Sequence, residues 1–149
     1  MQAGVKKVGM EAIIWGYILT GPGRPTRETQ RKVMGYVGAD TSAAGTIWED
    51  KLPARATRPQ SQLIERNYML GAVKPGDQVH FASLLCMGVS GPDVDWLLDQ
   101  LKRIGATAIV HDGIREVDPA EDRDAVIADF ERARNAMHVA RSRAKKNRS

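Results

Sequence analysis

The chain is poor in the residues that build disulfide frameworks and metal sites. Its one cysteine, Cys86, excludes an internal disulfide and is typical of a reducing compartment. Three histidines, His80, His111 and His138, stand on separate segments with no cysteine or carboxylate at ligand spacing. We therefore expect no metal site and no cofactor.

A long apolar run is also absent. The run over Ala12–Leu19 is too short to cross a bilayer, so we expect no membrane partner. Lys6 and Lys7 before it imitate a signal peptide, but Thr20-Gly21-Pro22-Gly23 follows in place of a small-residue cleavage site. We expect a buried first strand in a cytoplasmic protein, or in one within a phage particle, preceded by a flexible segment over residues 1–11.

Length and charge set looser bounds. At 149 residues with 42% hydrophobic residues, the chain suits one domain with an ordinary core. A formal net charge of +4 is mildly basic, and such a value by itself indicates solubility rather than nucleic-acid binding. The distribution of charge is therefore more informative than its total.

Hydrophobic periodicity predicts alternating strands and helices. The predicted elements are a strand over Ala12–Leu19, a helix over Pro25–Val37, a strand over Thr46–Trp48, a loop over Lys51–Gln60, a helix over Ser61–Val73, a strand over Val79–Leu85, a helix over Asp93–Ile104 and a strand over Thr107–His111. Strands separated by helices require crossover connections. We predict an α/β fold with a mostly parallel sheet flanked by helices, spanning residues 12–117.

A long helix is predicted over the remainder, residues 118–149. Asp118 is placed to cap it, with Pro119 in the first turn and Glu121 completing a capping box. Its apolar residues recur at alternating spacings of four and three, which is a heptad seam. The seam consists of Val126, Phe130, Ala133, Met137, Ala140 and Ala144. It predicts either a helix–helix interface between copies or a helix folded back on its own sheet; both stay open for the first half, and the interface is favoured for the second.

Charge sorts along the same helix. Acids dominate from Glu116 to Glu131, whereas none follows Arg132. The basic residues are Arg132, Arg134, Arg141, Arg143, Lys145, Lys146 and Arg148. Such a run fits a DNA phosphate backbone or is a solvated tail. Because it has no base-reading aromatic residue, any DNA contact should be electrostatic and indifferent to sequence.

Two stretches resemble a known family. Ile14-Trp15-Gly16-Tyr17 and Pro75-Gly76-Asp77-Gln78-Val79-His80-Phe81, continuing to Gly88, are similar to the catalytic domain of serine recombinases, the resolvases and DNA invertases. Weaker matches are Gln30, Gly38, Ile47–Lys51, Leu84 and His111–Ile114, and either Arg58 or Arg66 for a loop arginine. The resemblance covers roughly residues 12–134 and implies a resolvase-like sheet and a DNA partner.

The residues that perform strand transfer in that family are missing at the matching positions. Leu19 stands at the first arginine and Gly21 at the nucleophilic serine. Leu85, Cys86 and Val89 replace an aspartate and two arginines, with Ala82 and Ser83 in the lysine region. Glycine has no hydroxyl to attack phosphorus, and Thr20 or Ser83 would lack the surrounding cations. The resemblance thus implies a domain with no catalytic residues.

Two functions follow from this combination. The first is a catalytically inactive resolvase-like module that dimerises and binds DNA non-specifically through its last helix. The second is a structural or packaging homo-oligomer of a phage or phage-like particle. An active DNA recombinase is the least supported. We expect no small-molecule substrate, since Gly21-Pro22-Gly23 contains a proline without an amide donor and is a poor phosphate loop.

Overall fold

A five-stranded sheet forms the centre of the protein. The computed structural model describes residues 12–148, so the prediction for residues 1–11 lies outside the described part. The strands are β1 (Ile14–Thr20), β2 (Ile47–Lys51), β3 (Gln78–Phe81), β4 (Thr107–Val110) and β5 (Arg115–Val117). The strands lie in the order β2-β1-β3-β4-β5, and all pairings are parallel except that of β4 with β5. The predicted α/β class with a mostly parallel sheet is confirmed.

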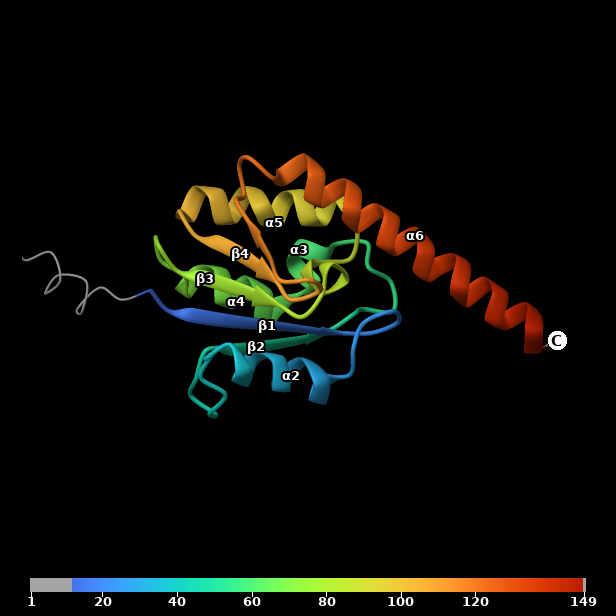
Figure 1. Ribbon diagram of the computed structural model, residues 1–149, viewed down its shortest axis with the longest axis horizontal. Coiled ribbons are helices and arrows are strands. Elements are labelled where there is room, and N and C mark those ends of the chain that lie inside the picture. The colour runs from blue at the N-terminus through green and yellow to red at the C-terminus, as the bar shows by residue number, and fades with distance from the viewer. Residues whose placement is uncertain (1–11, 149) are drawn as a thin grey trace, which may run out of the picture.

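Helices cover the two faces of the sheet unequally. The helices are α2 (Arg27–Tyr36), α3 (Pro59–Gln62), α4 (Ile64–Ala72), α5 (Gly91–Ile104) and α6 (Arg123–Arg148), with a 3-10 turn η1 (Leu84–Met87). Figure 1 shows α2 below the sheet and α3, α5 and α6 above it, and the buried Met69 of α4 belongs to the same core cluster as the buried residues of α5. The larger hydrophobic cluster fills the upper side, and a smaller one around Ile18 and Met34 lies under α2.

Side-chain caps explain why two helices start at other residues than predicted. Thr26 caps α2 by accepting a hydrogen bond from the amide of Thr29, so α2 begins at Arg27, two residues after the predicted Pro25. The predicted end of this helix at Val37 is confirmed within one residue, because α2 ends at Tyr36 with Val37 as its C-cap, and Gly38 follows with a φ of 92°. Ser90 caps α5, which therefore begins at Gly91, two residues before the predicted Asp93.

The predicted strand over Val79–Leu85 is too long. β3 ends at Phe81, and the apolar residues after Ser83 form η1 with Leu85 and Cys86 buried. An apolar run indicates that its residues are buried, but it does not tell whether they form a strand or a helical turn. The predicted helix over Ser61–Val73 is likewise divided between α3 and α4 at Leu63.

The long C-terminal helix is confirmed, but it begins one turn later than predicted. Asp118 accepts hydrogen bonds from the amides of Ala120 and Glu121 within a turn, and Asp122 accepts one from the amide of Asp118. The amide of Val126 then bonds to the carbonyl of Asp122, so α6 starts at Arg123. The described helices include none that is both long and apolar enough to cross a membrane.

Candidate functional site

The first half of α6 packs against its own chain. Val126 and Phe130 are 0% exposed and belong to the main core, where α6 contacts α5 and η1. The prediction that these two residues form an oligomer interface is wrong, because no exposed surface remains with which to contact a partner. Ala133 and Met137 are half-buried against the same core.

Ion pairs fix this half further. Arg123 contacts Asp95 of α5 at 2.6 Å, and Arg115 of β5 contacts Asp129 of α6 at 2.5 Å. Asp129 also pairs with Arg132, a predicted DNA-binding residue. The side chain of Arg132, although 73% exposed, is thus paired with a carboxylate of its own helix.

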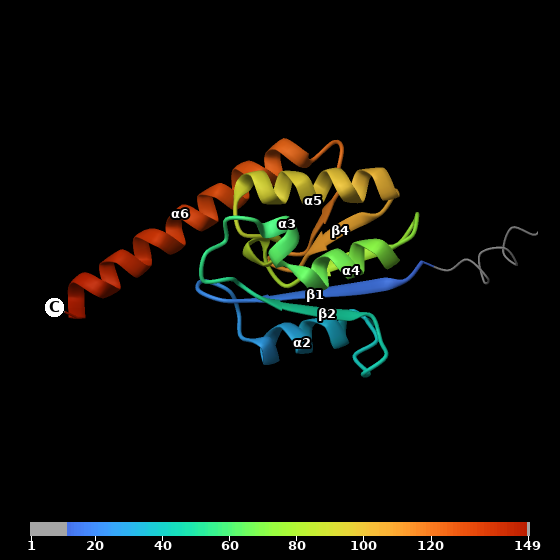
Figure 2. The ribbon, with the colours of Figure 1, turned by 180° about the vertical axis from the view of Figure 1, so that it is seen from behind.

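The second half of α6 leaves the body. Figures 1 and 2 show it extending from the sheet and its covering helices toward the C terminus. The predicted interface residues Ala140 and Ala144 are exposed here, as are the predicted DNA-binding residues Arg141, Arg143, Lys145 and Lys146. Arg148, also predicted to bind DNA, is the last residue of α6. The structure therefore keeps four basic residues together on one projecting segment.

Positions that match the strand-transfer residues of the resembled family lie within or beside the core. Leu19 and Cys86 are 0% exposed, and Leu85 and Val89 are also buried. Gly21 follows β1 with a φ of 149°, and a Cβ there would lie 2.7 Å from the Cβ of Leu52. A serine at this position would need both a strained backbone and a shifted neighbour.

The remaining polar residues of the resemblance make internal contacts. The amide of Gln30, 0% exposed, donates to the carbonyls of Leu19 and Pro25 and accepts from the amide of Leu19. Arg66 forms a two-bond pair with Asp93 at 2.6 and 2.8 Å, and both residues are 0% exposed. Arg58 is exposed in front of α3. Gln30 and Arg66 therefore hold the fold together rather than face a substrate.

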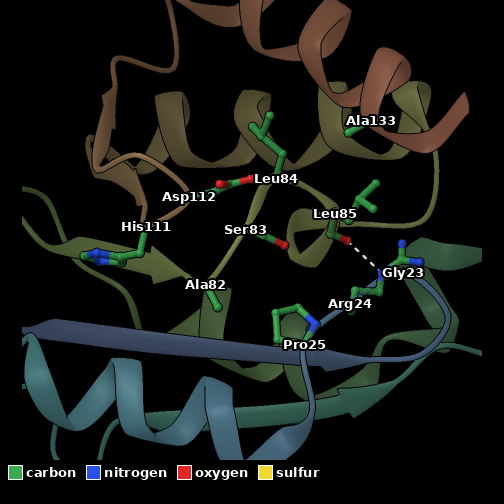
Figure 3. A pocket seen from close by; sticks show the side chains of 10 residues that line it. All are labelled: Gly23, Arg24, Pro25, Ala82, Ser83, Leu84, Leu85, His111, Asp112 and Ala133. Atoms are coloured by element: carbon green, nitrogen blue, oxygen red, sulfur yellow. Dashed lines mark hydrogen bonds between the residues drawn. The ribbon is translucent and has the colours of Figure 1, made fainter. Parts of the chain in front are cut away.

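A cavity of about 490 Å³ lies where β1, β3 and β4 end. Figure 3 shows its lining, which comes from the segments after these three strands and from α6. The lining residues are Gly23, Arg24, Pro25, Ala82, Ser83, Leu84, Leu85, His111, Asp112 and Ala133. Met137 of α6 packs on Gly23 of this lining, because a Cβ on Gly23 would come within 2.3 Å of Met137 Cγ.

Arg24 is the principal cation of this cavity, and the sequence prediction missed it. Its guanidinium donates to the carbonyls of Pro22, Leu85 and Gly88 at 2.8 to 2.9 Å. Burial is the largest cause that lowers the pKa of Arg24, and the charge of Arg134 lowers it further. Within the described part of the chain, neither arginine forms an ion pair with a carboxylate.

Two histidines from separate segments of the chain, His80 and His111, are in contact. His80 Nδ1 lies 2.8 Å from His111 Nε2, the rings stack, and His80 Nε2 lies 3.0 Å from Gln78 Oε1. Burial, and then the charge of His111, lower the pKa of His80 to about 4. His138 is exposed on α6, and no group of three metal-ligating side chains occurs among the described residues.

The thiol of Cys86 is shielded. Cys86 is 0% exposed, its Sγ lies 3.3 Å from Ser83 Oγ, and burial raises the pKa of the thiol. A raised pKa lowers the thiolate fraction that a nucleophile needs.

Comparison with known proteins yields no family that matches this chain and no similar curated protein.

Proposed function

We propose that the protein is a catalytically inactive, resolvase-like domain that binds duplex DNA non-specifically through the second half of α6. The observation that carries the proposal is the exposure of Arg141, Arg143, Lys145 and Lys146 on a helical segment that projects beyond the body. No acidic residue follows Glu131 in the sequence, so no side chain of this segment adds a negative charge. A basic helix of this kind can lie along the DNA backbone.

The proposed contact is with phosphates and not with base edges. The segment lacks Phe, Tyr and Trp, and its side chains that can donate hydrogen bonds are mostly long cations. With about four phosphate contacts, the logarithm of the binding constant should fall with that of salt concentration at a slope of about −3.6. That slope corresponds to a roughly hundredfold loss of affinity between 50 and 200 mM salt.

Absence of strand-transfer activity is the second part of the proposal. Its support is the set of apolar, buried residues at the matching positions, together with Gly21, where a Cβ collides with Leu52. We expect a supercoiled plasmid to stay intact during prolonged incubation with the protein. Nicking that is lost in a Ser83→Ala variant would contradict this part and leave the DNA-binding part standing.

Self-association completes the proposal, and a structural homo-oligomer of a phage-like particle is the alternative. Both draw support from the projecting half of α6, where Val139 is 48% exposed beside Ala140 and Ala144. Small residues let two helices approach closely. Mass measurement in solution separates them: a dimer supports the DNA-binding module, a ring or larger assembly supports the alternative, and a monomer at high concentration rejects self-association.

DNA binding is tested by fluorescence anisotropy with a labelled duplex of random sequence at several salt concentrations. A variant with Arg141→Gln and Arg143→Gln loses two exposed charges from the projecting segment. A matched control, Lys102→Gln with Arg103→Gln, loses two exposed charges from the end of α5. We expect the first pair to weaken binding and lower the salt slope while the control binds like the unmodified chain. Equal effects of the two pairs would reject a site on α6.

A further inference from the structure

The cavity beside Arg24 lies where the connections of the sheet diverge. From β1 the chain passes under the sheet through α2 to reach β2, whereas the connections to β3 and β4 pass over the opposite face. Open α/β sheets bind ligands outside the carboxyl ends of the strands at such a point. Here the segments after β1 and β3, the neighbouring strands, line the cavity.

The cavity has a cationic side. Arg24 uses three N–H groups on the carbonyls of Pro22, Leu85 and Gly88, which leaves two of its five donors. These carbonyls fix the guanidinium without cancelling its charge. Arg134 directly follows Ala133, which lines the cavity, and lies one turn before Met137, which packs on Gly23, so α6 brings a second positive charge near Arg24. Among the described residues, neither arginine forms an ion pair with a carboxylate.

The opposite side carries an acceptor. Figure 3 shows Asp112 across the cavity from Arg24, with Ser83 between them and Leu84, Leu85 and Ala133 supplying apolar wall. A carboxylate there repels a bare anion but accepts hydrogen bonds from N–H or O–H groups. The volume, about 490 Å³, falls within the range of roughly 300–1,000 Å³ that is usual for small-molecule sites.

We propose that this cavity binds a phosphorylated small molecule of mononucleotide size, with its phosphoryl group at Arg24 and Arg134 and its hydrogen-bond donors at Asp112. The expectation of no small-molecule ligand rested on the lack of amide donors in Gly21-Pro22-Gly23. Two guanidinium groups supply that function through side chains. The proposal is independent of DNA binding by the end of α6, since the two sites use different residues.

The test is a ¹H–¹⁵N NMR titration of the full chain with AMP, with inorganic phosphate and with adenosine, at ionic strength held constant by chloride. We expect saturable shifts from AMP at the amides of Gly23, Ser83 and Asp112, weaker binding of phosphate and no binding of adenosine. Absence of shifts at these amides, or AMP shifts confined to residues 138–147, would overturn the proposal. A blunt duplex of equal phosphate content separates the two sources of a phosphoryl group: a response of the cavity to the duplex but not to AMP also overturns it.

Variants assign the two sides of the cavity. Arg24→Gln removes bonds that join two loops and can unfold the protein, so Arg134→Gln is the primary variant. We expect Arg134→Gln to weaken AMP binding roughly tenfold or more, as for loss of a charged hydrogen bond, and Arg141→Gln to leave it unchanged. Asp112→Asn should weaken AMP binding without weakening phosphate binding. Equal AMP affinity in Arg134→Gln and the unmodified chain would reject the assignment of the phosphoryl group to Arg134. An unchanged ratio of AMP to phosphate affinity in Asp112→Asn would reject the assignment of the hydrogen-bond donors of the ligand to Asp112.

Discussion

The two halves of α6 share one hydrophobic seam but have opposite environments. Phe130 in the first half is 0% exposed, whereas Ala140 in the second half is exposed. Length explains the difference, because α6 has 26 residues and spans about 39 Å, while α5 beneath it has 14 and spans about 21 Å. The body can cover only part of α6. A heptad seam therefore identifies a face of a helix, and the neighbouring elements decide how much of that face is buried.

The largest expected effect is on the buried half. Phe130→Ala should lower the free energy of unfolding by about 3–5 kcal/mol, because it leaves a cavity between α6, α5 and η1. Val139→Ala, on the projecting half, should change it by less than about 0.5 kcal/mol. Urea denaturation measures both. Similar losses of unfolding free energy for the two variants would contradict the difference in burial between the two halves of α6.

The pH dependence of stability should also arise from a residue of the body, His80. His80 has its pKa lowered to about 4 from an ordinary value of 6.5, so between these values the unfolded chain binds more protons. Stability should be full above about pH 6.5 and fall as the pH drops toward 4, by up to about 3 kcal/mol. His80→Gln should flatten this slope in urea denaturation at a series of pH values. A slope flattened equally by His138→Gln on the projecting half would contradict the assignment.

Ion pairs at the start of α6 should contribute less. Arg123 bridges Asp95 and Asp99 of α5, with side chains that are 24%, 48% and 29% exposed. Because water screens such pairs, Arg123→Gln should cost less than about 1 kcal/mol of unfolding free energy. A loss as large as that of Phe130→Ala would mean that charge, rather than packing, holds α6 to the body.

The smallest expected effect is that of removing the projecting half. A chain that ends after Ala140 should have the same free energy of unfolding as the full chain, within about 0.5 kcal/mol, because residues 141–147 are exposed. Urea denaturation of the two chains measures the difference. A marked loss of stability would show that the projecting segment contacts the body.

The sequence predicts strands and helices well where the spacing of the apolar residues matches the face that the fold buries. The buried strand β1 appears in the sequence as a continuous apolar run. The buried face of α5 appears as the helical spacing of Leu97, Leu98 and Leu101. It fails where a turn decides the backbone. β5 was missed because it has three residues and follows Gly113 and Ile114, both with positive φ. Asp118, the predicted cap, accepts hydrogen bonds within a turn that precedes the helix, and α6 starts only after Asp122.

The site is less predictable because its parts are distant in the sequence. Arg24 stands alone in a turn, and nothing local indicates that Arg134 approaches it from α6. The contact of His80 with His111 requires the register of β3 and β4, in which His80 pairs with Ile109. A prediction that neighbouring parallel strands end together would have brought Ser83 and Asp112 to one edge.

The measurement that tests the central claim most directly is the salt dependence of duplex binding by the full chain and by the chain ending after Ala140. We predict a slope of about −3.6 for the full chain and no measurable binding at low salt for the shortened one. Equal affinity and equal slope for both chains would contradict the assignment of DNA binding to the projecting half of α6.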